Sequence, residues 1–97
     1  MSVFFMFGKY SMESLKQVSP DRTDKAVALI RRHGGDVKSM YTLLGEHDLV
    51  FIVDFPTMEE AMVASIGLSR LTGISFSTSP ALTVEKFDKM MAKAGDI

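Results

Sequence analysis

Residues 41–56 have the sequence YTLLGEHDLVFIVDFP, in which two apolar runs flank the segment Gly45–Asp48. Gly and Asp favour turns, because Gly adopts positive φ and an Asp carboxylate accepts hydrogen bonds from nearby backbone N–H groups. His47 and Asp48 are neighbours at the start of a strand, so their side chains should point to opposite faces and not act as a pair. We therefore predict a turn between two antiparallel strands, with structural roles for Gly45 and Asp48 and little role for His47.

The rest of the chain supplies two more strands and three helices. Ser19 before Pro20, and Thr57 three residues before Glu60, are helix-start signals of the N-cap and capping-box kinds. Apolar residues at helical spacing and glycine stops give the extents. We predict strands at 3–9, 36–44, 48–55 and 74–82, and helices at 20–33, at 57–73 and from 84 onward, with a plain connection over 10–18. The buried stripe of the second helix should comprise Met58, Ala61, Ala64, Ser65, Leu68 and Leu71.

The order β-α-β-β-α-β, followed by a tail helix, is typical of the ferredoxin-like α+β fold, here a single domain over residues 1–97. This fold has a four-stranded antiparallel sheet with the first and third strands in the centre. Residues 3–7 and 49–53 are apolar at every position, whereas 36–40 and 74–78 alternate, as central and edge strands do. Both helices cover one face, so the other face would expose apolar side chains. Such a patch usually marks an interface. We expect a homodimer or higher oligomer, a dimeric α+β barrel, unless the tail helix covers the sheet through Phe87 and Met91.

Composition excludes several classes of function. The 97 residues carry a net charge of -1, with 11 Lys and Arg against 12 Asp and Glu, so no basic footprint for nucleic acid is present. Without Cys there are no disulfides and no thiolate chemistry. The two histidines have no metal-ligand spacing, and no glycine-rich phosphate loop occurs, so we expect neither metal nor cofactor. No run reaches the roughly 20 apolar residues of a membrane span. We expect a cytoplasmic protein that does not bind membranes.

Short motifs along nearly the whole chain resemble the GYD-domain family of small bacterial and archaeal proteins. These motifs are GKYS at 8–11, the Ser19–Pro20 helix start, Tyr41–Thr42 followed by Gly45 and Asp48, Asp54 with Pro56, and ALTVEKFDKM at 81–90. The Gly-Tyr-Asp signature of the family is split here, and His47 stands at the place of its Tyr. The turn is also distantly similar to that of the effector-binding domains of leucine-responsive regulators. The resemblance implies the fold and a dimeric assembly; it implies no particular activity.

A candidate site follows from the strand ends. We expect the first and third strands to run parallel, so that Lys9–Tyr10 and Asp54–Phe55 meet at one end of the sheet. Asp54 ends an apolar strand, where a carboxylate is costly unless it is partnered or functional. Lys38 and Tyr41, on the neighbouring second strand, complete the candidate set. Such a cluster describes either a small-molecule pocket or a solvated strand end with a salt bridge. A second candidate is the inter-subunit barrel, among Phe5, Phe7, Met40 and Phe51.

Two functional hypotheses remain. The first is an oligomeric module that binds a small organic molecule at the sheet face or between subunits, without catalysis. The second is a monooxygenase- or isomerase-like enzyme of the dimeric α+β barrel type, with Asp54 or Tyr10 as acid or base. No strong catalytic motif occurs, and fold alone does not imply activity, so the first is favoured.

Overall fold

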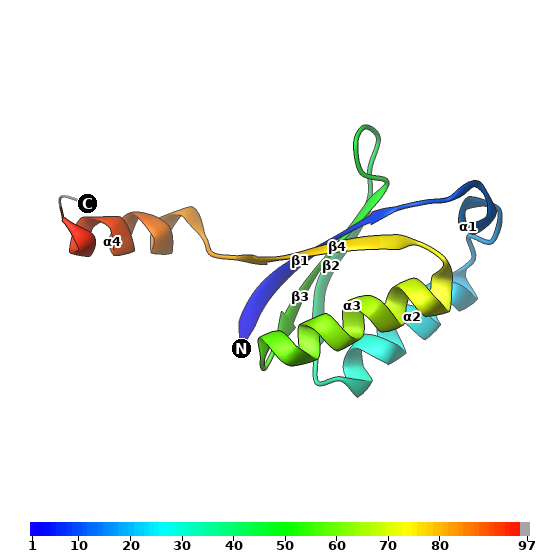
Figure 1. The fold of residues 1–97 in the computed structure, drawn as a ribbon, viewed down its shortest axis with the longest axis horizontal. Helices are drawn as coiled ribbons and strands as arrows, with labels where there is room; N and C mark the ends of the chain where they lie inside the picture. The colour runs from blue at the N-terminus through cyan, green and yellow to red at the C-terminus, as the bar shows by residue number, and fades with distance from the viewer. Residues whose placement is uncertain (96–97) are drawn as a thin grey trace.

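Four strands form one antiparallel sheet in the order β2-β3-β1-β4 (Figure 1). The computed structural model describes residues 1–95. The elements in chain order are β1 (Ser2–Lys9), α1 (Met12–Lys16), α2 (Pro20–Arg32), β2 (Asp36–Thr42), β3 (Leu49–Phe55), α3 (Met58–Thr72), β4 (Ser75–Ala81) and α4 (Val84–Ala94). The predicted fold is confirmed, with β1 and β3 in the centre of the sheet and β2 and β4 at its edges.

The helix ends follow from their capping residues. Ser19 Oγ accepts the N–H of Arg22 at 3.1 Å, and Pro20 occupies the first turn of α2. Thr57 Oγ1 accepts the N–H of Glu60 at 3.1 Å, the first bond of the predicted capping box. The Glu60 carboxylate, however, lies 3.3 Å from His33 Nδ1, so it joins the start of α3 to the end of α2.

Two predictions about the helices were wrong. The segment predicted as a plain connection contains α1, which Ser11 caps through reciprocal hydrogen bonds with Ser14. In α3, Met58 and Leu71 are exposed, and Thr72 is buried in the place of Leu71. Thr72 is tolerated inside because its hydroxyl donates to the Leu68 carbonyl and accepts the N–H of Ile74.

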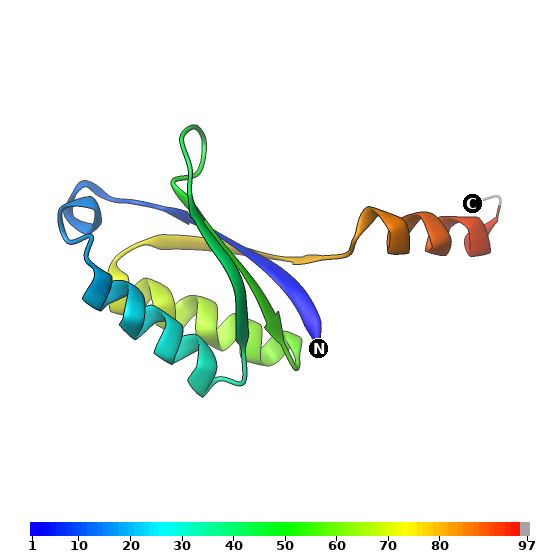
Figure 2. The same ribbon diagram turned by 180° about the vertical axis from the view of Figure 1, so that it is seen from behind.

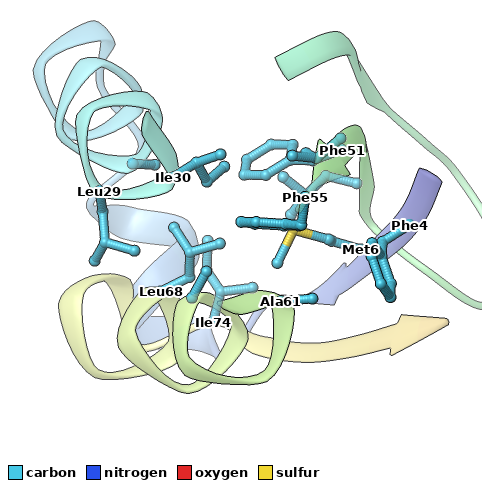
Figure 3. Close-up of a cluster of buried hydrophobic side chains, with 13 residues drawn as sticks. Phe4, Met6, Leu29, Ile30, Phe51, Phe55, Ala61, Leu68 and Ile74 are labelled. Atoms are coloured by element: carbon cyan, nitrogen blue, oxygen red, sulfur yellow. The ribbon is translucent and has the colours of Figure 1, made fainter. Parts of the chain in front are cut away.

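The core lies between the sheet and the pair α2 and α3, which run side by side along one face (Figures 1 and 2). Alternation along β1 sends Phe4 and Met6 inward, where both are buried. Figure 3 shows Met6 and Phe55 extending from the sheet toward Leu68. The Phe4 and Phe55 rings meet edge to face at 5.8 Å. This packing fixes which side of each central strand remains uncovered.

The other face of the sheet, which we call the open face, carries a row of apolar side chains. On the central strands these are Val3, Phe5, Phe7 and Ile52, which are partly exposed, and Val50, which is buried. Phe5 and Ile52 are direct cross-strand partners, as are Phe7 and Val50. Neither helix of the α2–α3 layer covers this side (Figure 2). Met40 and Phe51 pair with each other on the helix side, so the alternative cluster of Phe5, Phe7, Met40 and Phe51 is split between the two faces.

The tail helix α4 continues beyond β4 and extends away from the sheet (Figures 1 and 2). None of its residues is buried, and Phe87 is 51% exposed. The alternative to the oligomer, in which this helix covers the sheet through Phe87 and Met91, therefore does not occur. The arm explains why the radius of gyration is 15.0 Å, above the roughly 12–13 Å of a compact domain of this size.

Candidate functional site

Asp54 belongs to a charged cluster with Asp36 and Lys38. Asp36 and Asp54 are direct cross-strand partners of β2 and β3, an arrangement in which two like charges repel. Lys38 Nζ lies 3.0 Å from Asp36 and 3.3 Å from Asp54. A register shift between Val37 and Ser39 places Lys38 in a β-bulge. The two carboxylates, first through hydrogen bonds and then through charge, raise the pKa of Lys38.

The predicted meeting of Lys9 and Tyr10 with Asp54 does not occur. β1 and β3 are antiparallel, and Asp54 pairs with Val3 at the start of β1, whereas Lys9 ends that strand. A helical crossover returns the chain so that β2 runs in the direction of β1, and the β2–β3 turn then reverses it. The third strand must therefore oppose the first. Of the predicted contacts of Asp54, the one with Lys38 is confirmed.

Lys9 and Tyr10 instead contact the turn at 43–48. Lys9 Nζ donates to the Glu46 carbonyl at 3.1 Å, and the Tyr10 N–H donates to the Asp48 carboxylate at 2.8 Å. The Asp48 N–H donates to the Gly8 carbonyl, also at 2.8 Å. Asp48 thus joins the end of β1 to the turn between β2 and β3.

The turn prediction is confirmed at Gly45, whose φ of +123° lies in the region that favours glycine. His47 and Asp48 do point apart. The imidazole of His47 stacks on Phe7 at 4.7 Å, on the open face, while Asp48 holds the Tyr10 backbone. This contact was not predicted from the sequence, and a stacked aromatic pair contributes roughly 0.5–1.5 kcal/mol.

A pocket of about 180 Å³ lies between the helix layer and the sheet, and two predicted site residues, Tyr10 and Tyr41, line it. Its lining comes from five elements and the segments beside them: Tyr10, Val18, Arg22, Thr23, Ala26, Met40, Tyr41, Thr42, Leu49, Phe51, Thr72, Ile74 and Phe76. Tyr10 packs against the core, whereas Tyr41 is exposed and pairs with Val50, so its side chain lies on the open face. The lining is mainly apolar, with Arg22 and three threonines among it.

Arg22 is the charged residue of the lining, and the sequence reasoning missed it. One of its guanidinium nitrogens, Nη1, donates to the Ser14 carbonyl at 2.6 Å. The guanidinium also lies 5.9 Å from the centroid of the Tyr10 ring, within cation–π range. A signal was present: Arg22 is the third residue of α2, where the helix dipole favours acidic side chains and not cations. The helix dipole therefore does not explain why a cation occupies this position, and a different role has to be sought for Arg22.

Residues 1–95 offer few other features that indicate a function. No three His, Asp or Glu side chains in this part of the chain gather as metal ligands would. None of the helices described has the length and apolar character needed to span a bilayer.

The antiparallel sheet, with two helices on one face and an open second face, defines a ferredoxin-like α+β protein. A comparison with protein families matches the GYD domain over residues 2–91, so the chain belongs to the GYD domain family. A comparison with curated protein sequences gives no significant match.

Solved structures share the fold at low identity. The crystal structure of the Mycobacterium tuberculosis leucine response regulatory protein (LrpA) is similar with a TM-score of 0.56 and 16% identity, over 86% of this chain and 51% of the other. A structure of a glutamate-to-alanine mutant matches with the same score, identity and coverage. This chain therefore spans about half the length of the structures that it resembles, and the similarity concerns the fold.

Proposed function

We propose that this protein is a self-associating module that binds a small organic molecule without transforming it. The observation that carries the proposal is the apolar pocket lined by Tyr10 and Arg22. Apolar walls with a few convergent polar groups are typical of small-molecule sites. The pocket lies between the sheet and the helices, whereas the sequence pointed to the sheet face or an inter-subunit space.

Geometry disfavours the enzymatic alternative. The alternative has Asp54 or Tyr10 as acid or base, and a reaction that used both would need them near one substrate. Asp54 lies at the end of the sheet where β1 begins, and its carboxylate is paired with Lys38. Tyr10 follows the other end of β1 and lines the pocket. Asp54 is better explained as part of a structural ion pair.

Self-association through the open face completes the proposal. The apolar residues of β1 and β3 form the middle of this face. On one side lie Asp36, Lys38 and Asp54, and on the other Ser75, Ser77 and Ser79 of β4. An apolar centre within a polar rim is the usual anatomy of a protein interface. We take the occupant to be a second copy of this chain, because a two-fold axis would bring identical apolar strips together.

Filling the pocket tests the binding function. Met40 is half-exposed at its border, so Met40→Trp should occupy the space with little effect on the core. The matched control is Met90→Trp, the same change on α4. We expect fragments of one-ring size, screened by ligand-observed NMR, to bind the wild type and Met90→Trp but not Met40→Trp. Fragments that bind all three proteins equally would show that the pocket is not the site, and turnover of a bound fragment would contradict the non-catalytic role.

A further inference from the structure

Building on the binding function proposed above, we infer that the pocket takes a small apolar monocarboxylate, held through Arg22. The charge of the lining points to this class. Arg22 is the one ionisable cation among the lining residues, and no Asp or Glu lines the pocket. Among residues 1–95, no carboxylate forms an ion pair with Arg22. The positive charge at the border is therefore available to an anion.

The local environment strengthens this positive charge. Arg22 sits in the first turn of α2, where unpaired backbone N–H groups give the helix a partial positive end. A guanidinium has five N–H donors, and the bond from Nη1 to the Ser14 carbonyl uses one. That bond and the Tyr10 ring hold the side chain in place, so little freedom is lost when an anion binds. The remaining donors can meet both oxygens of a carboxylate.

The volume and walls define the body of the ligand. A cavity of about 150 Å³ admits benzene. A pocket of about 180 Å³ therefore suits one aromatic ring or a branched aliphatic group of similar size. Phe51, Ile74 and Phe76 provide apolar contacts for such a group. Benzoate, phenylacetate and isovalerate are probes of this class.

The same lining discriminates against α-amino acids. Their ammonium group would enter the site next to Arg22, and no carboxylate of the lining would receive it. Moving an ammonium group out of water costs free energy that no ion pair compensates in this pocket. A zwitterion should therefore bind more weakly than the carboxylic acid that lacks the amino group. We therefore expect phenylpropanoate and phenylalanine, which share the ring and the carboxylate, to differ in affinity for the pocket.

Matched acids and amides test the role of charge. We expect benzoate and phenylacetate to bind the wild type at least about tenfold more tightly than benzamide and phenylacetamide, measured by calorimetry or NMR titration. Phenylpropanoate should likewise bind more tightly than phenylalanine. In Arg22→Gln the acids should lose this advantage, while the affinity of the amides stays unchanged. Lys25→Gln is the control, since Lys25 lies on the same helix but pairs with Asp21 in solvent.

The amides also separate the possible failures. Arg22 contacts α1, so Arg22→Gln could disturb the pocket; unchanged amide binding demonstrates that the pocket is intact. Equal affinity of acid and amide for the wild type would overturn the carboxylate inference and leave the binding function standing. Equal loss of acid and amide in Arg22→Gln would make Arg22 a structural support of α1 and would also overturn the inference. Loss of neither acid nor amide in Met40→Trp would refute the pocket itself.

Discussion

Lys38 bridges two aspartates that would otherwise face each other across β2 and β3. The side chain of Asp54 is only 17% exposed, and a carboxylate at that depth needs a counter-charge. Lys38 supplies it from the bulge, where its stem can reach both carboxylates. The sequence alone presented Asp54 as a candidate for function; its partners give it a structural role.

This bridge predicts a dependence of stability on alkaline pH. Because folding raises the pKa of Lys38 above its ordinary 10.5, the stability that it contributes is complete below that pH and is lost as the pH rises through the folded-state pKa. Lys38→Met should therefore lower the melting temperature at about pH 8, and this deficit should shrink as the pH rises above 10.5. Lys25→Met, at an exposed helical pair, is the control. A deficit of Lys38→Met that stayed constant as the pH rose above 10.5 would contradict the bridge.

Asp48 should matter more than any other residue of the turn. Asp48→Ala removes the acceptor of the part-buried Tyr10 N–H, and a hydrogen bond to a charged group contributes about 1.5–3 kcal/mol. Asp48→Asn keeps an acceptor oxygen and should cost less. Denaturant unfolding measures both variants. Glu46→Ala, which leaves the backbone carbonyl for Lys9, should be nearly neutral; an equal loss in that control would mean that any change in the turn is damaging.

At the level of elements, α4 stands out because few interactions stabilise it. It has 11 residues and none is buried. An isolated helix shorter than about 12–15 residues is marginal in water, because its stability normally comes from packing. Thr83 caps it and Glu85 pairs with Lys89, but such interactions add only a few tenths of a kcal/mol to about 1 kcal/mol each.

We therefore expect hydrogen exchange to separate α4 from α3. Amides of α4 should exchange rapidly in dilute protein, while those around Ala64 and Leu68, which are fully buried, should be protected. A chain that ends after Leu82 should melt at the same temperature as the full chain. Strong protection of α4, or a large loss of stability on truncation, would mean that its apolar side is packed against another chain.

The elements that the sequence predicted well are those with local signals. Ser19, Thr57 and Gly73 mark helix ends through their own side chains or backbone, and all three do so in the structure. The five residues of α1 are too few to show an apolar period, so the sequence did not predict this helix. Leu71 and Thr72 are adjacent on α3, and hydrophobicity favours the wrong one, because the two hydrogen bonds of Thr72 compensate its burial.

For the whole molecule, the open face predicts a dimer. At micromolar concentration, native mass spectrometry or sedimentation should give a dimer for the wild type. Phe5→Lys places a charge at the centre of the face and should give a folded monomer, because Phe5 is already partly exposed. Met62→Lys, on the exposed side of α3, should remain dimeric. A dimer that survives Phe5→Lys would place the interface elsewhere.

The candidate site shows where sequence reasoning stops. The contact between Lys38 and Asp54 could be predicted, because it depends on neighbouring strands. The grouping of Lys9 and Tyr10 with Asp54 was wrong, because it depended on the direction of β3 relative to β1. The pocket brings together Arg22, Met40 and Phe76 from three different elements. No local pattern relates such residues; only the assembled fold does.

The bulge in β2 has a consequence at high protein concentration. An edge strand with a regular row of free N–H and C=O groups can template a strand of another molecule, which is how sheets grow into fibrils. Between Val37 and Ser39 the register of β2 shifts, and the extra residue is a lysine. A docking strand would meet a broken ladder and would have to accommodate the charge of Lys38. The residue that balances two aspartates thus also opposes uncontrolled lateral growth of the sheet.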